Sequence, residues 1–168
     1  VSGERTGPKL REFVEQGGRL LAIGSSALNL ARMLDLPVDS ALVETDETGR
    51  PRPLPNTKFY IPGSVLRVRL AKGPLSRGMP DEADAMFDGS PSFRLRPGST
   101  ATTGAWYDGD RPLRSGWAWG QEALKGSAAV VSVPLGKGTV VLYGPEVAFR
   151  GQPHGTFKLL FNGIFGAE

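Results

Sequence analysis

The chain has 168 residues, of which 39% are hydrophobic and 22% charged, with 23 glycines, 14 prolines and a formal net charge of +3. This length predicts one domain over residues 1–168, and the glycine and proline content predicts a loop-rich fold rather than a helical bundle. The lack of cysteine excludes disulfides and cysteine nucleophiles, the scattered Lys and Arg residues argue against nucleic-acid binding, and no apolar run reaches the roughly 20 residues of a membrane helix.

The first third of the chain shows a helix, strand, helix order. A helix is predicted over 8–16 from the spacing of its apolar residues, and residues 19–23 form the short apolar run that is typical of a buried strand. Gly24 allows a sharp turn, after which Ser25 or Ser26 is predicted to cap a second helix. This order favours an α/β fold.

The middle of the chain is less regular. Charge, proline and glycine dominate residues 44–57, which predicts a surface loop excursion. Apolar residues nearly alternate with others over 59–70, which predicts a half-buried strand. Between residues 71 and 126, short runs compatible with strands lie between turn signals.

The last third predicts a hairpin followed by a helix. Two β-branched runs, 128–134 and 139–143, are separated by Leu-Gly-Lys-Gly, so they are expected to pair as antiparallel strands. Residues 157–164 have apolar side chains at helical spacing, and Thr156 is predicted to cap this helix. The pattern therefore predicts an α/β fold whose last two strands form a C-terminal antiparallel hairpin.

The turn at Gly24 resembles a nucleophile elbow, in which a strand leads through a sharp turn into a helix and exposes a nucleophile. Ser25 and Ser26 are the candidate nucleophiles, His154 is the only histidine, and Glu146 could orient it, so Ser25, His154 and Glu146 form the one triad that can be written. The G-x-S-x-G motif is absent, however. Helix capping by the serines and a loop hydrogen bond by His154 are the favoured alternatives.

A loop before the last helix is a candidate anion site, because free N–H groups and the helix dipole attract negative charge there. Its alternative is that Arg150 pairs with Glu146 or with a nearby carbonyl. The predicted anion- or partner-binding residues are Arg150, Gly151, His154, Gly155 and Thr156.

Other residues that could carry chemistry point to structural roles. One histidine and no cysteine cannot supply a usual catalytic zinc site, so no metal or other cofactor is expected in this chain. Asp81, Glu82 and Asp84 look like a solvated acidic turn. Trp106, Tyr107, Trp117 and Trp119 could form a stacking platform for a sugar or a partner, although aromatic residues are more often core or interface residues.

With these residues described, LLAIGSSAL and VVLYGPE resemble the skeleton of class I glutamine amidotransferase-like domains. In that pattern the nucleophile position matches Gly24 and the histidine position matches Gly144, while Pro145 and Glu146 remain. The resemblance implies an α/β, flavodoxin-like sandwich with a mixed sheet and a C-terminal antiparallel hairpin, in which the triad is degenerate. It also implies that the first strands lie upstream of Val1, unless antiparallel strands from the second half complete the sheet.

A second resemblance is carried by YIPGSVLRVRL, GPLSRGMP, SGWAWG and FRGQPHGTFKLLFNGIF, which are similar to the region C-terminal to the peptidase unit in bacterial zinc carboxypeptidase-superfamily proteins. It implies a non-catalytic accessory domain, with the peptidase domain of the parent hydrolase as its partner and a secreted or periplasmic location. Two alternatives remain: a serine-type hydrolase using Ser25 or Ser26 with His154, and a module that binds small anions or peptide carboxylates.

Overall fold

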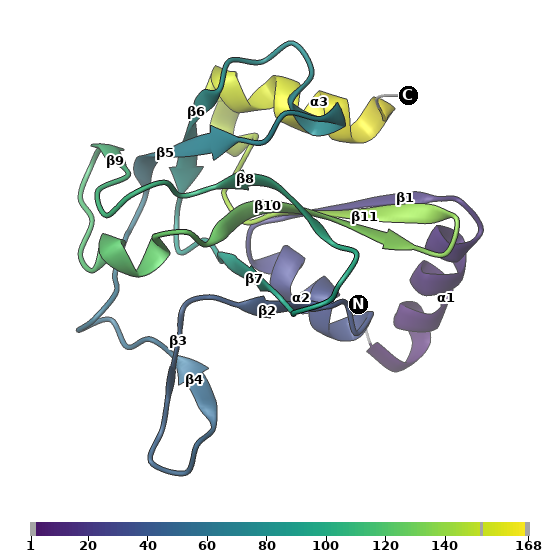
Figure 1. Cartoon of the computed structure of the whole chain (residues 1–168), viewed down its shortest axis with the longest axis horizontal. Helices are drawn as coiled ribbons and strands as arrows, with labels where there is room; N and C mark the ends of the chain where they lie inside the picture. The colour runs from purple at the N-terminus through teal and green to yellow at the C-terminus, as the bar shows by residue number, and fades with distance from the viewer. Residues whose placement is uncertain (1–2, 152, 167–168) are drawn as a thin grey trace.

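The structure, a computed structural model, describes residues 3–151 and 153–166, which form an α/β sandwich around a curled mixed sheet (Figure 1). The main strand order is β1-β11-β10-β8-β5-β6. Strand β1 (Arg19–Ile23) is parallel to β11 (Gly138–Tyr143), whereas β11 is antiparallel to β10 (Ala128–Leu135). The predicted fold class, a mixed sheet with a C-terminal antiparallel hairpin, is confirmed.

Antiparallel strands from both halves of the chain extend this sheet beyond β10. Strand β2 pairs with β7, β7 also pairs with β10, and β9 pairs with β5. Strand β1 lies at one end of the main strand order and β6 lies at the other. The bounds of these strands are β2 (Val38–Ser40), β5 (Ser64–Leu70), β6 (Glu82–Phe87), β7 (Phe93–Leu95), β8 (Thr102–Trp106) and β9 (Leu113–Ser115).

Helices cover both faces of the sheet. Helices α1 (Gly3–Glu15) and α2 (Ser25–Met33) pack on one face, where Val14 and Leu30 join a buried cluster that includes Val140. Helix α3 (Phe157–Phe165) covers the other face, where Leu159 joins a second cluster with Tyr143 (Figure 1). No helix among the described residues is long and apolar enough to cross a membrane.

Short 3₁₀ helices complete the described structure, and two of them frame the loop before α3. They are η1 (Pro74–Ser76), η2 (Gln121–Leu124), η3 (Phe149–Gly151) and η4 (His154–Thr156). Strand β5 shows the alternation expected from its sequence, since every second residue from Ser64 to Leu70 is buried. This pattern places the Arg67 and Arg69 side chains on the partly exposed face.

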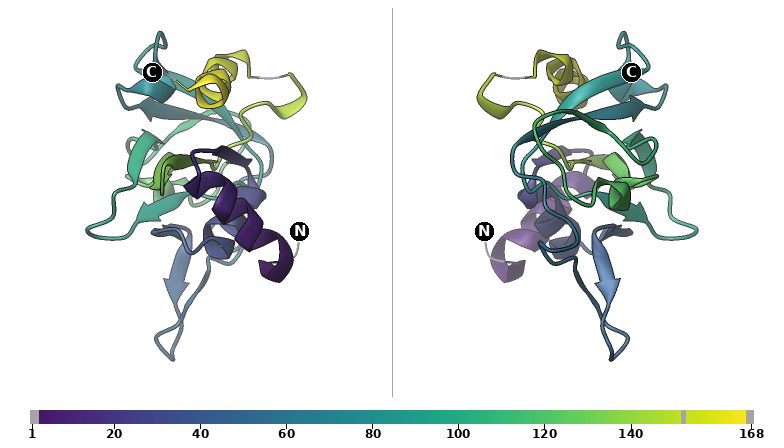
Figure 2. Two further views of the ribbon diagram at one scale, coloured as in Figure 1. Left: turned by 90° about the vertical axis from the view of Figure 1, so that its right-hand side faces the viewer. Right: turned by 90° about the vertical axis from the view of Figure 1, so that its left-hand side faces the viewer.

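The stretch 44–57, predicted as a surface loop, contains a hairpin arm made of β3 (Val43–Thr45) and β4 (Pro51–Pro53). The Asp46 carboxylate shapes its turn by accepting hydrogen bonds from the Thr48 amide at 2.8 Å and the Arg50 amide at 2.9 Å. The arm projects away from the main sheet (Figures 1 and 2). Pattern reading missed it because side-chain hydrogen bonds, rather than an apolar period, hold the turn.

Candidate functional site

The predicted elbow lies where β1 and β11 end side by side. Ile23 pairs with Tyr143 in the parallel ladder, and the Gly24 amide donates to the Tyr143 carbonyl at 2.9 Å. The chain then enters α2 through Gly24, whose φ of 62° favours glycine. Gly24 and Gly144 therefore directly follow a pair of bonded residues at the carboxyl ends of β1 and β11.

A carboxylate fills the space over Gly24. A Cβ atom on Gly24 would lie 1.9 Å from Glu146 Oε1, so the carboxyl group packs directly against the Gly24 backbone. Its segment is fixed by the Glu146 amide, which donates to the Met86 carbonyl at 2.8 Å. Burial raises the pKa of Glu146, and the negative charge of Asp88 raises this pKa further. Glu146 is thus a constrained acid at the elbow.

We expect Glu146→Gln to stabilise the chain at pH 7, because the raised pKa means that the folded state binds the Glu146 proton more tightly than the unfolded state does. The stability due to this proton is fully present below the ordinary carboxyl pKa of 4.5 and is lost as the pH rises through the higher folded-state pKa. The glutamine variant should therefore gain at pH 7 and show little difference at the acid end. Urea unfolding of both proteins from pH 4 to pH 7 measures this change.

The control is Glu47→Gln, which removes one negative charge from an exposed position on the hairpin arm. A Glu146→Gln variant that is less stable at pH 7 would contradict the assignment. That result would mean that the carboxylate charge is stabilised by the nearby N-terminus of α2.

Neighbouring backbone also closes the space at Gly144, where the sequence resemblance led us to expect a degenerate histidine position. A Cβ atom on Gly144 would lie 2.2 Å from the Pro91 carbonyl oxygen and 3.1 Å from that of Ala129. The Gly144 amide also donates to the Ala129 carbonyl at 2.8 Å. No histidine fits at position 144 unless the backbone of a neighbouring segment moves.

The two serines at the elbow do not cap α2. The N-cap residue is Gly24, and no side chain accepts a capping hydrogen bond there, so the predicted cap is wrong. The Ser26 hydroxyl instead donates to the Ile23 carbonyl at 2.6 Å. Ser25 is exposed and makes no side-chain hydrogen bond within the described part of the chain.

In the described part of the chain, His154 interacts with none of these groups and contacts Phe157 instead. It is exposed in η4, and its ring packs beside that of Phe157 with centroids 5.3 Å apart. Within residues 3–151 and 153–166, no hydrogen bond joins the imidazole to Ser25, Ser26 or Glu146. The structure thus brings Glu146 to the serine turn but does not assemble the triad that the sequence suggests.

The predicted anion loop is partly committed to other contacts. The Arg150 guanidinium lies over the Phe149 ring, 5.1 Å from its centroid, and forms no ion pair with Glu146 in the described structure. Gly151 and Gly155 are exposed, and position 152 lies outside the described residues. Anion binding by these residues stays a prediction.

Thr156 differs from the other residues of this loop, because it is fully buried and its hydroxyl donates to the Val147 carbonyl at 2.6 Å. It makes no side-chain cap on α3, so the capping prediction is wrong. Through this bond the buried Thr156 hydroxyl ties η4 to the segment that follows β11. The hydroxyl therefore does not face a ligand.

The acidic residues near position 82 pair with arginines across the sheet. Glu82 lies on β6 and contacts Arg69 at 3.0 Å, and Asp84 contacts Arg114 at 3.3 Å. Among the described residues, no group of three or more His, Cys, Asp or Glu side chains could hold a metal ion. These carboxylates belong to an exposed ion-pair network.

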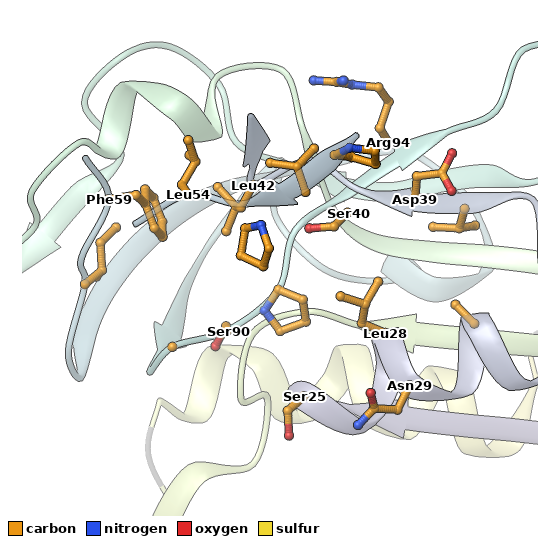
Figure 3. A pocket seen from close by; sticks show the side chains of 18 of the residues that line it. Ser25, Leu28, Asn29, Asp39, Ser40, Leu42, Leu54, Phe59, Ser90 and Arg94 are labelled. Atoms are coloured by element: carbon orange, nitrogen blue, oxygen red, sulfur yellow. The ribbon is translucent and has the colours of Figure 1, made fainter. Parts of the chain in front are cut away.

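A groove with a volume of about 890 Å³ runs along α2. Ser25, Leu28 and Asn29 line it from α2, and the opposite side includes Leu42 and Phe59 (Figure 3). His154 is not among the described residues that line it. Ser25 is therefore the one predicted catalytic candidate among the described residues that line the groove.

Polar side chains border the apolar walls of this groove. Asn29, Asn56 and Arg94 are exposed and have no side-chain hydrogen bond within the described residues. Arg96, by contrast, is paired with Asp39 at 3.0 Å. The sequence did not reveal the groove, because its lining comes from four separated segments and no local motif joins them.

Comparisons with known proteins return structural similarity only, since no family model and no curated protein matches the sequence. The β-galactosidase from Bacillus circulans sp. alkalophilus has a TM-score of 0.56 at 12% identity, covering 96% of this chain and 20% of that one. The cold-adapted β-galactosidase from Rahnella sp. R3 has a TM-score of 0.54 at 16% identity, and the match covers 98% of this chain and 21% of that one. The exo-β-1,4-mannosidase from Opitutaceae bacterium strain TAV5 has a TM-score of 0.50 at 14% identity, and the match covers 99% of this chain and 23% of that one.

These findings contradict the family assignment made from sequence motifs. The similar structures are regions of glycosidases, not amidotransferase-like domains associated with zinc carboxypeptidases. At identities this low the likeness shows the fold alone. The present chain spans about a fifth of the length of each glycosidase.

Proposed function

We propose that this chain is a non-catalytic accessory domain of a larger protein, built on a fold that glycosidases also contain. The carrying observation is the closed elbow: the Glu146 carboxylate occupies the space over Gly24, and the Pro91 carbonyl occupies the space at Gly144. Covalent hydrolysis by a triad needs a nucleophile and a base within hydrogen-bond reach of each other. Neither glycine supplies such a group, and among the described residues no hydrogen bond joins Ser25 or Ser26 to His154.

The share of each chain that the structural matches cover also supports the accessory role. The chain matches glycosidase regions over nearly its whole length while covering only 20 to 23% of those proteins. A domain of this size within a multidomain enzyme commonly supplies surface for binding or for contacts between domains. The proposed role is therefore interaction, with catalysis located elsewhere in the larger protein.

The test is an activity assay of the 168-residue chain with aryl glycosides, esters, amides and glutamine. We expect no turnover above that of a Ser25→Ala, Ser26→Ala double variant. Turnover that disappears in this double variant, or in His154→Ala, would overturn the proposal and favour the serine-type hydrolase. Retained folding of each variant is checked by its thermal unfolding midpoint.

A further inference from the structure

Three exposed aromatic side chains form a cluster outside the elbow, made of Tyr60, Trp117 and Trp119. Their exposed fractions are 45%, 53% and 54%, although aromatic residues normally bury most of their surface. The Tyr60 and Trp117 rings meet edge to face, with centroids 5.9 Å apart. Of the aromatic residues noted in the sequence, Tyr107 is fully buried, so it belongs to the core rather than to this aromatic cluster.

Backbone and side-chain hydrogen bonds hold the aromatic cluster in place. Tyr60 and Trp119 form an isolated antiparallel bridge, with both amide-to-carbonyl distances at 3.0 Å. The Trp117 amide donates to the Ser64 hydroxyl at 2.9 Å, and this hydroxyl donates to the Trp117 carbonyl at 2.6 Å. Little conformational entropy is then lost when a ligand packs on these rings.

The indole of Trp119 has no free polar atom for a ligand. Its Nε1–H donates to the Thr57 carbonyl at 2.9 Å. The exposed part of this side chain is therefore an aromatic face, which can only stack. A ligand for this surface must present a flat apolar face of its own.

The aromatic cluster is continuous with the groove beside α2. Tyr60 and the free amide of Asn56 line the groove. Phe59 and the free amide of Asn29 also line it (Figure 3). An amide offers two donors and one acceptor oxygen, which suits neighbouring hydroxyl groups. A volume of about 890 Å³ lies within the range of binding pockets for small ligands.

We propose that the aromatic cluster and the groove together bind an oligosaccharide. A pyranose ring has an apolar C–H face that stacks on tyrosine and tryptophan, and its rim of hydroxyls fits the amides of Asn29 and Asn56 and the guanidinium of Arg94. A protein partner fits less well, since a stable interface buries about 800 Å² on each side. Three aromatic side chains that are about half exposed supply only a fraction of that area.

The inference rests on the proposed accessory function, because it holds that the groove binds a sugar without hydrolysing it. It differs from the predicted anion loop in both place and chemistry. Neutral sugars are expected to bind without Arg150 or His154.

The test is titration of the 168-residue chain with galactotetraose, mannohexaose and cellohexaose, followed by tryptophan fluorescence and calorimetry. We expect saturable binding of at least one sugar at concentrations up to about 10 mM. Trp117→Ala and Trp119→Ala should each weaken it by about tenfold or more. Asn56→Ala should also weaken binding, whereas Phe165→Ala, which truncates an aromatic residue that is 80% exposed on α3, should leave it unchanged.

Absence of saturation with all three sugars would overturn the inference, as would equal binding by the wild-type chain and Trp117→Ala. Self-association that is lost in Trp117→Ala, without any sugar binding, would assign the aromatic cluster to a protein interface instead. The Trp119→Phe variant keeps an aromatic face and should bind more tightly than Trp119→Ala if both remain folded. Hydrolysis of a bound sugar would contradict the proposed non-catalytic function but not the binding site, so the two failures are distinguishable.

Discussion

Gly144→Ala is expected to lower the free energy of unfolding by about 3 kcal/mol, because the added methyl group has no room. Its Cβ would lie 2.2 Å from the Pro91 carbonyl oxygen and 3.1 Å from that of Ala129. Both atoms belong to backbone, so they cannot move aside as the end of a flexible side chain can. Urea unfolding at pH 7 measures the loss.

The matched control is Gly155→Ala, because Gly155 is exposed and an added Cβ there would meet no atom within 4 Å. Its effect should stay within about 0.5 kcal/mol, as for most surface substitutions. A Gly144→Ala protein as stable as wild type would show that the Pro91 segment readily moves. Position 144 could then accept a larger side chain, and the argument that the elbow is closed would fail.

The parts of the fold that could be predicted are those with a local physical cause. Residues 19–23 are an apolar run ended by glycine, and they form β1 with those bounds. The Gly136 turn between two β-branched runs gives the β10–β11 hairpin, because glycine takes a φ of 61° there without strain. Helix α3 follows from its apolar spacing.

The features that were missed depend on distant contacts. Ser25 and Ser26 have the residue type of a cap, but the Ser26 hydroxyl bonds to the preceding strand and Gly24 takes the N-cap position. Likewise, no local pattern separates Tyr107, which is in the core, from Trp119, which is exposed. Their burial is decided by pairing between segments, such as the bridge from Tyr60 to Trp119.

Site prediction was limited in the same way. The closeness of Glu146 to Gly24 follows from parallel pairing of β1 with β11, and the two glycines that follow these strands could be noticed in the sequence. The groove could not, because residues from α2, β2 and the hairpin arm meet only in the folded chain. Short motifs also led to a family assignment that the structural comparisons contradict.

Phe87→Ala is expected to cost about 3–5 kcal/mol of unfolding free energy, the range for truncating a large buried aromatic residue. Phe87 has no exposed surface and contacts two other rings edge to face. The centroid distances are 6.0 Å to Phe59 and 6.1 Å to Tyr107. Truncation opens a cavity and also removes both ring contacts, which each contribute about 0.5–1.5 kcal/mol beyond burial.

This substitution also tests how the core supports the groove, since Phe59 lines the groove and packs on Phe87 from within. Phe87→Leu keeps most of the apolar volume but removes the edge-to-face contact, so it should cost less stability than alanine while still loosening Phe59. Phe161→Ala is the control, because its ring is 52% exposed and should change stability by less than about 1 kcal/mol. A loss from Phe87→Ala no larger than that of the control would contradict the packing, and with it the view that the groove wall is held rigid by the core behind it.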